Sequence, residues 1–286
     1  MERLQEAIAR ARAERHGEVG KLPDFDKQRT AVTPASERGA SDQPRPYAPA
    51  SRKGANAPPP ENIEYSITRQ VVLDEAVLEK NRVIAGQHDD QRAEAYRQLR
   101  TQVLQTFERH NWSSLAITSP REDAGKTLTA VNLAISLSEE TNQTVILVDL
   151  DLKTPDVHGT FGVKIDYGVV DIVEGRATVE QALFNPHRPR LVVLPGRPLG
   201  RYSSEILTSP AMKNLLRDIT SRYDSRLVIF DLPPLLRNDD ALKFVPYADA
   251  TLMVVEEGVN TPEEVERCIH LMRNANFIGT ILNKAR

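Results

Sequence analysis

SPREDAGKT, from Ser119 to Thr127, lies between two segments of different character. The apolar run Leu115–Thr118 before it predicts a buried strand, and Lys126–Glu139 after it predicts a helix. A glycine, a lysine and a hydroxyl residue between a strand and a helix are typical of a phosphate-binding loop. In such a loop the backbone N–H groups and the N-terminus of the helix hold the phosphates of a nucleotide.

Each residue of the Gly-Lys-Thr sequence has a part in this chemistry. Lys126 would reach the β- and γ-phosphates of ATP, and the hydroxyl of Thr127 would complete the coordination shell of Mg²⁺. Gly125 lets the backbone come close to the phosphates. We therefore expect ATP and Mg²⁺ as ligands, with the nucleotide contacted by Glu122, Asp123, Ala124, Gly125, Lys126, Thr127 and Leu128.

The loop departs from the usual pattern at two glycine positions. Pro120 occupies the first, and Asp123 occupies the one two residues before Gly125. Backbone amides survive such substitutions, and Asp tolerates a positive φ better than most residues. Glu122 and Asp123 nevertheless repel a polyanion unless both side chains point outward. The alternative reading is an ordinary strand-to-helix turn capped by polar residues.

Two further acidic sites follow apolar runs. Asp149 and Asp151 end VILVDLDLK, and the alternation of a strand predicts both side chains on one face. There they could hold Mg²⁺ and accept a proton from an incoming hydroxyl. Asp231 ends LVIFDLPP, the place for a metal-orienting carboxylate. The alternative interpretation of these three acids is that they lie at solvated strand ends. Asn283, after the last expected strand, could bind a purine edge or cap a turn.

Apolar runs alternate with helical segments through most of the chain, which predicts an α/β fold with a mostly parallel sheet covered by helices on both faces. In such sheets ligands bind beyond the carboxyl ends of the strands. The expected strands are Leu115–Thr118, Thr144–Asp149, Leu191–Leu194, Leu227–Asp231, Thr251–Val255 and Ile278–Leu282. The expected helices are Gln91–His110, Lys126–Glu139, Pro210–Arg222, Asp239–Pro246 and Pro262–Ala275.

The chain divides into three segments by composition. Residues 1–16 carry apolar residues at helical spacing and predict a short amphipathic docking helix, with a fraying helical end as the alternative. Residues 17–62 are rich in proline and poor in aliphatic residues, which predicts a disordered linker. Residues 63–286 form the folded domain, in which 63–85 could lie across the surface.

Composition and charge exclude several classes of function. The formal net charge of −3 provides no basic field to attract nucleic acid. The one cysteine, Cys268, rules out an intramolecular disulfide, and its helical context makes it a core residue. The histidines show no metal-ligand spacing. We see no signal peptide and no run long enough to cross a bilayer, so we expect the protein in the cytoplasm.

The helix expected over Gln91–His110 has two distinct arcs. Tyr96, Leu99, Val103 and Phe107 share an apolar arc that should face the core. The neighbouring arc carries three charges that we expect to be exposed, on Glu94, Arg97 and Arg100.

Several stretches together resemble the bacterial tyrosine kinase domain, the CpsD/CapB-like cytoplasmic autokinases of exopolysaccharide and capsule synthesis. That family lies within the MinD/ParA-like P-loop ATPases, so the resemblance implies a P-loop NTPase fold. It covers about residues 93–284. The stretches are SPREDAGKTLTAVNLA, VILVDLDLKTPDVHGTFG, SSEILTSPAM, YDSRLVIFDLPP and GTILNK.

The resemblance implies roles for particular residues. Lys126 belongs to the Walker A motif, and Asp149 and Asp151 would be the catalytic and Mg²⁺-linked acids. Asp231 would be the Walker B acid, so that Thr127, Asp151 and Asp231 surround the metal. The family also has a Glu-x-x-Arg-x-x-Arg motif that drives ring-shaped oligomers. Glu94, Arg97 and Arg100 match this motif, although a solvated charged face would look the same.

Family members act with a transmembrane polysaccharide copolymerase, a Wzz-like chain-length determinant. The resemblance therefore implies a separate membrane partner, with the chain at the inner face of the plasma membrane only through it. The helix over residues 1–16 is our hypothesis for the docking element.

The chain departs from the family in two places. Family kinases usually carry a C-terminal tyrosine cluster, whereas the last tyrosine here is Tyr247, and Lys153 replaces the Arg usual after the acidic pair. Three functions stay open: a kinase for tyrosines of another protein, a MinD/ParA-type ATPase that acts as a positioning switch, and a nucleotide-binding scaffold with little turnover.

Overall fold

The computed structural model describes residues 68–87, 90–200, 202–221 and 225–285. The helix expected over residues 1–16 and the linker expected over 17–62 lie outside these ranges. The described part begins at residue 68, inside the segment that we expected to cross the domain surface. In that segment Leu78, Val83 and Ala85 are buried in the core.

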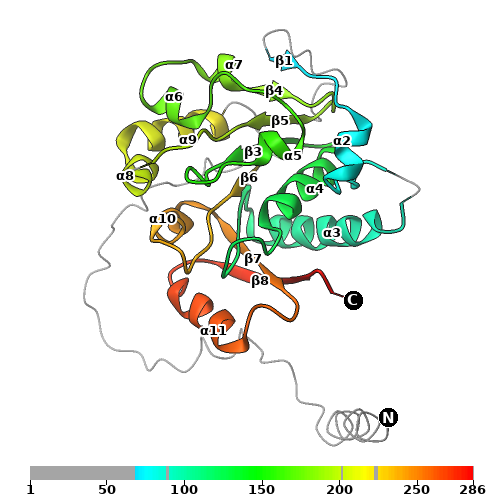
Figure 1. Cartoon of the computed structure of the whole chain (residues 1–286), viewed down its shortest axis with the longest axis vertical. Helices are drawn as coiled ribbons and strands as arrows, with labels where there is room; N and C mark the ends of the chain where they lie inside the picture. The colour runs from blue at the N-terminus through cyan, green and yellow to red at the C-terminus, as the bar shows by residue number, and fades with distance from the viewer. Residues whose placement is uncertain (1–67, 88–89, 201, 222–224, 286) are drawn as a thin grey trace, which may run out of the picture. The chain divides into compact units, whose positions relative to one another are not determined.

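The centre of the fold is a sheet that contains eight strands within the described residues (Figure 1). Neighbouring strands are parallel, except that β4 and β5 pair antiparallel. The prediction of a mostly parallel sheet is therefore confirmed. The spatial order is β1 (Arg69–Gln70), β4 (Phe184–Asn185), β5 (Leu191–Leu194), β3 (Thr144–Asp149), β6 (Arg226–Asp231), β2 (Ser114–Thr118), β7 (Ala250–Glu256) and β8 (Phe277–Asn283).

The sequence did not reveal β1 and β4, because two residues are too short to show a period of two. The helices expected from long periodic segments are present. These are α3 (Ala93–His110), α4 (Lys126–Ser138), α9 (Pro210–Ser221), α10 (Asp240–Phe244) and α11 (Pro262–Leu271). The shorter helices were missed, namely α2 (Glu75–Lys80), α5 (Val157–Thr160), α6 (Val169–Val173), α7 (Val179–Ala182) and α8 (Ser203–Thr208).

The end of α10 shows how proline limits a helix. We expected a helix from Asp239 to Pro246, but α10 ends at Phe244 and continues as the 3₁₀ turn η2 (Val245–Tyr247). Pro246 has no N–H to donate to the carbonyl one turn earlier, so the α-helical hydrogen-bond ladder stops there.

Alternate residues of the central strands enter two separate apolar cores. Ile146 and Val148 of β3 pack on one side of the sheet with residues of α9 and α10. Leu147 of β3 and Ile117 of β2 pack on the other side with residues of α3 and α4. Both faces of the sheet are therefore buried, which is why its strands read as continuous apolar runs.

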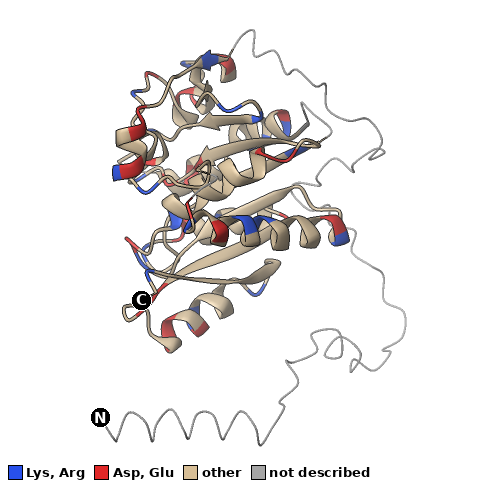
Figure 2. Ribbon diagram, turned by 90° about the vertical axis from the view of Figure 1, so that its right-hand side faces the viewer, with Lys and Arg blue, Asp and Glu red and all other residues tan. Residues whose placement is uncertain are grey.

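Helix α3 packs as its apolar arc predicts. Val103 and Phe107 are buried, and Tyr96 and Leu99 pack partly buried against the same core. Acidic and basic residues are interspersed over the described helices and loops (Figure 2). Among the described residues, no helix is both long and apolar enough to span a bilayer.

Candidate functional site

The carboxyl ends of three adjacent strands bring the candidate residues together. Asp231 at the end of β6 is the register partner of Asp149 at the end of β3 and of Ile117 in β2. The loop 119–125 leaves β2 at the same edge and enters α4. Residues separated by about a hundred positions in the sequence therefore meet at one edge of a parallel sheet, as the topology requires.

The loop before α4 depends on left-handed backbone at two positions. Gly125 has φ 91° and Asp123 has φ 60°. A Cβ on Gly125 would lie 2.1 Å from Nδ2 of Asn283, so only glycine fits there. Asn283 also donates a hydrogen bond to the carbonyl of Ala124 at 2.9 Å. The end of β8 thus supports the loop, and a contact of Asn283 with a purine stays a prediction.

Charges in the loop are neutralised by residues from distant segments. The carboxylate of Glu122 lies 2.8 Å from Nε of Arg237, which follows β6. Arg121 forms an ion pair with Glu264 of α11. Asp123 is exposed to solvent. The repulsion expected from Glu122 is therefore balanced by Arg237, a partner that the sequence pattern did not identify.

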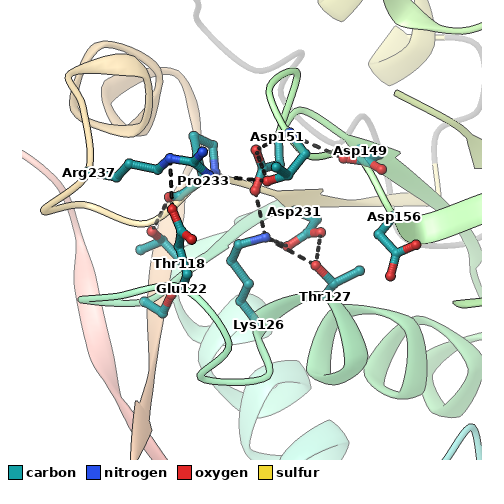
Figure 3. Close-up of polar contacts among 12 residues, drawn as sticks. Thr118, Glu122, Lys126, Thr127, Asp149, Asp151, Asp156, Asp231, Pro233 and Arg237 are labelled. Atoms are coloured by element: carbon teal, nitrogen blue, oxygen red, sulfur yellow. Dashed lines mark hydrogen bonds and ion pairs between the residues drawn. The ribbon is translucent and has the colours of Figure 1, made fainter. Parts of the chain in front are cut away.

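Lys126 extends from the first turn of α4 into a group of buried oxygens (Figure 3). Its Nζ lies 2.8 Å from Oδ2 of Asp151, 3.8 Å from Oδ1 of Asp231 and 3.1 Å from Oγ1 of Thr127. The hydroxyl of Thr127 donates to Oδ2 of Asp231 at 2.7 Å. The four residues predicted around phosphate and metal are thus in direct contact.

Burial acts in opposite directions on the cation and the acids. For Lys126, burial lowers the pKa, but the charges of Asp231 and Asp151 outweigh it and raise the pKa. For Asp231, burial raises the pKa to about 6, although Lys126 and the Thr127 hydroxyl act to lower it. For Asp149, complete burial and then the charge of Asp231 raise the pKa well above its ordinary value. Lys126 is therefore charged at neutral pH.

The strand alternation from which we expected Asp149 and Asp151 on one face does not extend to Asp151. Strand β3 ends at Asp149, and the chain then turns. The Asp149 carboxylate accepts hydrogen bonds from the N–H groups of Asp151 at 3.2 Å and Val157 at 3.0 Å. The Asp151 carboxylate instead contacts Lys126 and accepts from the N–H of Thr154 at 3.1 Å. The strand period ceases to apply once the strand has ended.

The carboxylates of the site are suited to bind Mg²⁺ together with water and phosphate oxygens, rather than to enclose the ion alone. Among the described residues, no group of three or more His, Cys, Asp or Glu side chains is arranged as a metal cage. Mg²⁺ usually takes one or two carboxylates, with water and phosphate oxygens for the rest. Oδ1 of Asp231 is buried and has no hydrogen-bond partner within the described residues. It lies beside the Thr127 hydroxyl, and this donor set fits Mg²⁺.

The charged arc of α3 is not fully exposed, in contrast to the expectation. Glu94 and Arg97 pair with each other at 2.8 Å near the surface. Arg100 is half-buried, pairs with Glu139 and Glu140 at 3.1 Å each, and donates to the carbonyl of Ser136 at 2.9 Å. Arg100 therefore holds the C-terminal end of α4, because a cation is favourable where carbonyls are unpaired.

Other contributors at the edge of the sheet were missed. Gly196, after β5, packs so closely that an added Cβ would lie 3.0 Å from the Asp149 carbonyl oxygen. Thr154 and Arg237 approach each other, with Nη1 of Arg237 3.4 Å from the Thr154 hydroxyl. The signal in the sequence that could have identified Gly196 was a glycine just beyond a strand.

Two of the residues expected to contact the nucleotide are partly or fully covered by the protein. Leu128 is half-buried against the core, and Ala124 is buried.

Comparison with known proteins adds family evidence to this geometry. The family model AAA_31, an AAA domain, matches residues 114–276. The chain belongs to this AAA-domain family. The match includes the loop before α4 and every strand from β2 to β7, so it covers the fold and the site together.

The relatives of this AAA domain include bacterial tyrosine kinases. This chain is 28% identical over 208 residues to the tyrosine-protein kinase YwqD of Bacillus subtilis (strain 168), and the alignment covers 72% of this chain and 86% of YwqD. It is 33% identical over 175 residues to the succinoglycan biosynthesis transport protein ExoP of Rhizobium meliloti (strain 1021), covering 59% of this chain but only 22% of ExoP.

A solved structure agrees with these relatives. The kinase domain of Escherichia coli tyrosine kinase ETK superposes with a TM-score of 0.65 at 26% identity, covering 75% of this chain and 88% of that domain. The resemblance of this AAA domain to bacterial tyrosine kinases is confirmed.

Proposed function

We propose that this AAA domain is an ATP- and Mg²⁺-dependent protein tyrosine kinase that controls the polymerisation and export of an exopolysaccharide or capsule. The observation that carries the proposal is the contact of Lys126 with Asp151 and Asp231 at the carboxyl edge of the sheet, beside Thr127. The names of YwqD and ETK support a kinase, and the name of ExoP supports a role in polysaccharide transport.

The residues of the site divide the work of phosphoryl transfer. The loop 122–128 would bind the phosphates through its backbone N–H groups, and Lys126 would neutralise charge on the transferred group. Asp149 would accept the proton of the attacking hydroxyl, since burial raises the pKa of its carboxyl and so makes the carboxylate a stronger base than an ordinary one. Each oxygen of this carboxylate keeps a second lone pair beyond its backbone hydrogen bond.

Thr127, Asp151 and Asp231 are the residues that would hold Mg²⁺. When bound, the ion would supply positive charge to the phosphate oxygens. Asp231 holds the Thr127 hydroxyl in place, and Asp151 holds Lys126, so the side chains are oriented before any nucleotide enters.

A membrane partner and self-assembly form the wider part of the proposal. The ExoP match covers a small share of a longer transport protein, whereas the YwqD match covers most of a shorter kinase. We propose that this chain works with a separate transmembrane polysaccharide copolymerase at the inner face of the plasma membrane. The charged arc of Glu94 and Arg97 is our candidate for contacts in a ring of copies, with Arg100 as its support.

A second candidate function has its own supporting observation. Asp149 has no exposed surface, and Gly196 packs against its carboxyl carbon, where an added Cβ would lie 3.1 Å away. A water molecule needs less room there than a tyrosine ring. This favours an ATPase of the positioning-switch type, in which water is the nucleophile.

Incubation with γ-labelled ATP and Mg²⁺ tests the two candidates. A kinase retains label on protein tyrosine, and an ATPase releases it only as free phosphate. The Lys126→Ala and Asp149→Asn variants are the controls, and the kinase proposal requires both to lose tyrosine labelling. A scaffold would bind nucleotide without either product, and Lys126→Ala would leave polysaccharide output intact in cells.

A further inference from the structure

A buried acid lies between the helices α8 and α10, which pack against each other (Figure 1). Asp240, in the first turn of α10, is 2% exposed. Its Oδ2 accepts a hydrogen bond at 2.7 Å from the hydroxyl of Ser203, a buried residue at the start of α8. The N–H of Asp240 donates to the side chain of Asn238 at 3.0 Å. These contacts fix the carboxylate, but a single hydroxyl does not balance a buried negative charge.

The balancing cation comes from the loop after β3. Nζ of Lys153 lies 3.9 Å from the same Oδ2 of Asp240, and the Lys153 side chain is 33% exposed. This distance is too long for a hydrogen bond. Within the described residues, no hydrogen bond from this ammonium to a protein atom is present. Asp240 therefore attracts the ammonium and leaves its three N–H groups available to a ligand.

Lys153 belongs to the turn that carries Asp151. Oδ1 of Asp151 accepts hydrogen bonds from the N–H of Thr154 at 3.1 Å and from its hydroxyl at 3.2 Å. Arg237, in the loop before α10, holds the same turn through the Thr154 hydroxyl. The backbone of Lys153 is thus fixed within two residues of the acid that contacts Lys126.

The strand order determines which end of a nucleotide would lie near Lys153. The loop 119–125 follows β2, with β6 and then β3 on one side and β7 and then β8 on the other. Asp149, the proposed base, ends β3, so the γ-phosphate of a bound ATP would lie on the β3 side. A cation in the loop after β3 is therefore on the side of the terminal phosphate.

We propose that Asp240 is a positioning residue that holds the ammonium of Lys153 against the γ-phosphate of bound ATP. The proposal rests on the ATP binding proposed above and adds a second cation to it. The acids at positions 149, 151 and 231 share Lys126, and a triphosphate brings further negative charge to the same edge of the sheet. A second cation reduces that repulsion where the γ-phosphate lies.

Calorimetric titration of the full-length chain with Mg²⁺ and either ADP or a non-hydrolysable ATP analogue tests the proposal. Asp240→Asn keeps the size of the side chain and an oxygen for the Ser203 hydroxyl, but removes the charge that attracts Lys153. Asp240→Asn and Lys153→Met should each weaken binding of the analogue about fivefold, the upper scale for charges at a partly exposed site, and leave ADP affinity unchanged. Lys153→Arg, which keeps the charge, should retain the preference for the analogue.

A double variant shows whether Asp240 acts through Lys153. Asp240→Asn, Lys153→Met should bind the analogue no more weakly than Lys153→Met alone, because both substitutions remove the same interaction. Asp239→Asn is the matched control. It removes the same charge one residue earlier, at an exposed carboxylate that pairs with Lys243 at 2.7 Å, and should bind both nucleotides as wild type does. If Asp240→Asn does not fold, Ser203→Ala replaces it and should give a smaller loss of the same kind.

The outcomes separate this proposal from the proposed function. Equal weakening of ADP and analogue by Asp240→Asn, together with lower stability to urea, would mean that Asp240 only supports packing, and would overturn the positioning role. Unchanged analogue binding by Lys153→Met would overturn the contact with the γ-phosphate. Wild type that binds neither nucleotide would overturn both proposals. A selective loss of analogue binding without any tyrosine labelling by wild type would overturn the kinase function alone.

Discussion

Nε of Arg237 lies 2.8 Å from the carboxylate of Glu122, joining the loop after β6 to the loop before α4. Glu122 is one of the two acidic residues that made the phosphate-binding loop unusual. Its side chain is turned onto a guanidinium that comes from 115 positions later in the sequence. The ion pair explains how a carboxylate can lie next to the proposed triphosphate site.

Loss of Arg237 should weaken nucleotide binding. We expect Arg237→Ala to reduce ATP affinity about fivefold, because interactions between partly exposed charges are worth up to about 1 kcal/mol. The Glu122→Gln, Arg237→Ala double variant should regain most of that loss. Calorimetric titration at low and moderate salt checks both. Equal ATP affinity of Arg237→Ala and wild type would mean that Glu122 does not face the phosphates.

Gly125 should not tolerate a side chain. Gly125→Ala places a Cβ 2.1 Å from Nδ2 of Asn283 in a left-handed backbone, which itself costs about 1–2 kcal/mol. Gly175→Ala is the matched control, because Gly175 has φ 74° and open space around it. Urea unfolding should show the larger loss for Gly125→Ala, and only that variant should lose ATP binding. Similar losses for the two would remove the role given to Asn283.

Lys126 should matter for both binding and stability. Lys126→Met leaves two buried carboxylates without their cation, and removing one partner from a buried ion pair typically costs about 3–5 kcal/mol. We expect a lower melting temperature together with loss of ATP binding. The stability deficit should shrink on acidification through about pH 6, the raised pKa of Asp231, because the protonated Asp231 carboxyl no longer needs the cation. Lys80→Met, at an exposed position of α2, is the control and should change neither property.

Substitutions of Arg97 and Arg100 in α3 should have different effects, one on self-assembly and the other on stability. Arg100→Ala removes hydrogen bonds to charged partners and to the end of α4, a loss of about 2 kcal/mol by comparison with similar contacts. Arg97→Ala breaks an exposed pair and should cost less than about 1 kcal/mol. If the arc mediates a ring, Arg97→Ala should reduce the mass measured by light scattering without altering unfolding. An unchanged mass at matched concentration would argue against that role for Arg97.

Asp171 should give stability that depends on pH. Burial tends to raise its pKa, but hydrogen bonds from the Gly168 N–H, Arg176 and Arg197 outweigh burial and lower the pKa. A lowered folded-state pKa gives stability that is present above the unfolded pKa of about 3.9 and lost as pH falls through the folded value.

Asp171→Asn should therefore be less stable than wild type at pH 7 by about 2 kcal/mol, the scale of hydrogen bonds to a charged group. The difference should diminish below about pH 4, as wild-type Asp171 becomes protonated. Urea unfolding between pH 7 and pH 3 measures it, with the exposed Asp166→Asn as control. A difference that does not change with pH would mean that the charge of Asp171 contributes nothing.

The local pattern of the sequence determined the alternation of strands and helices, the loop at Gly125 and the placement of Asp149 and Asp231 at strand ends. These features depend on neighbouring residues, since a period of two or of 3.6 and the backbone freedom of glycine act over a few positions. The apolar arc of α3 was predictable for the same reason.

Only the tertiary structure decided which side chains meet. Glu122 pairs with Arg237, and Arg100 binds the end of α4. Beyond the end of β3, the Asp149 carboxylate accepts from backbone N–H groups, whereas the Asp151 carboxylate contacts Lys126. The short elements β1 and β4 also depend on neighbours, because two residues cannot form a strand alone. Partner choice follows from where the loops of a parallel sheet converge, and that convergence is set by strand order rather than by any pattern along the chain.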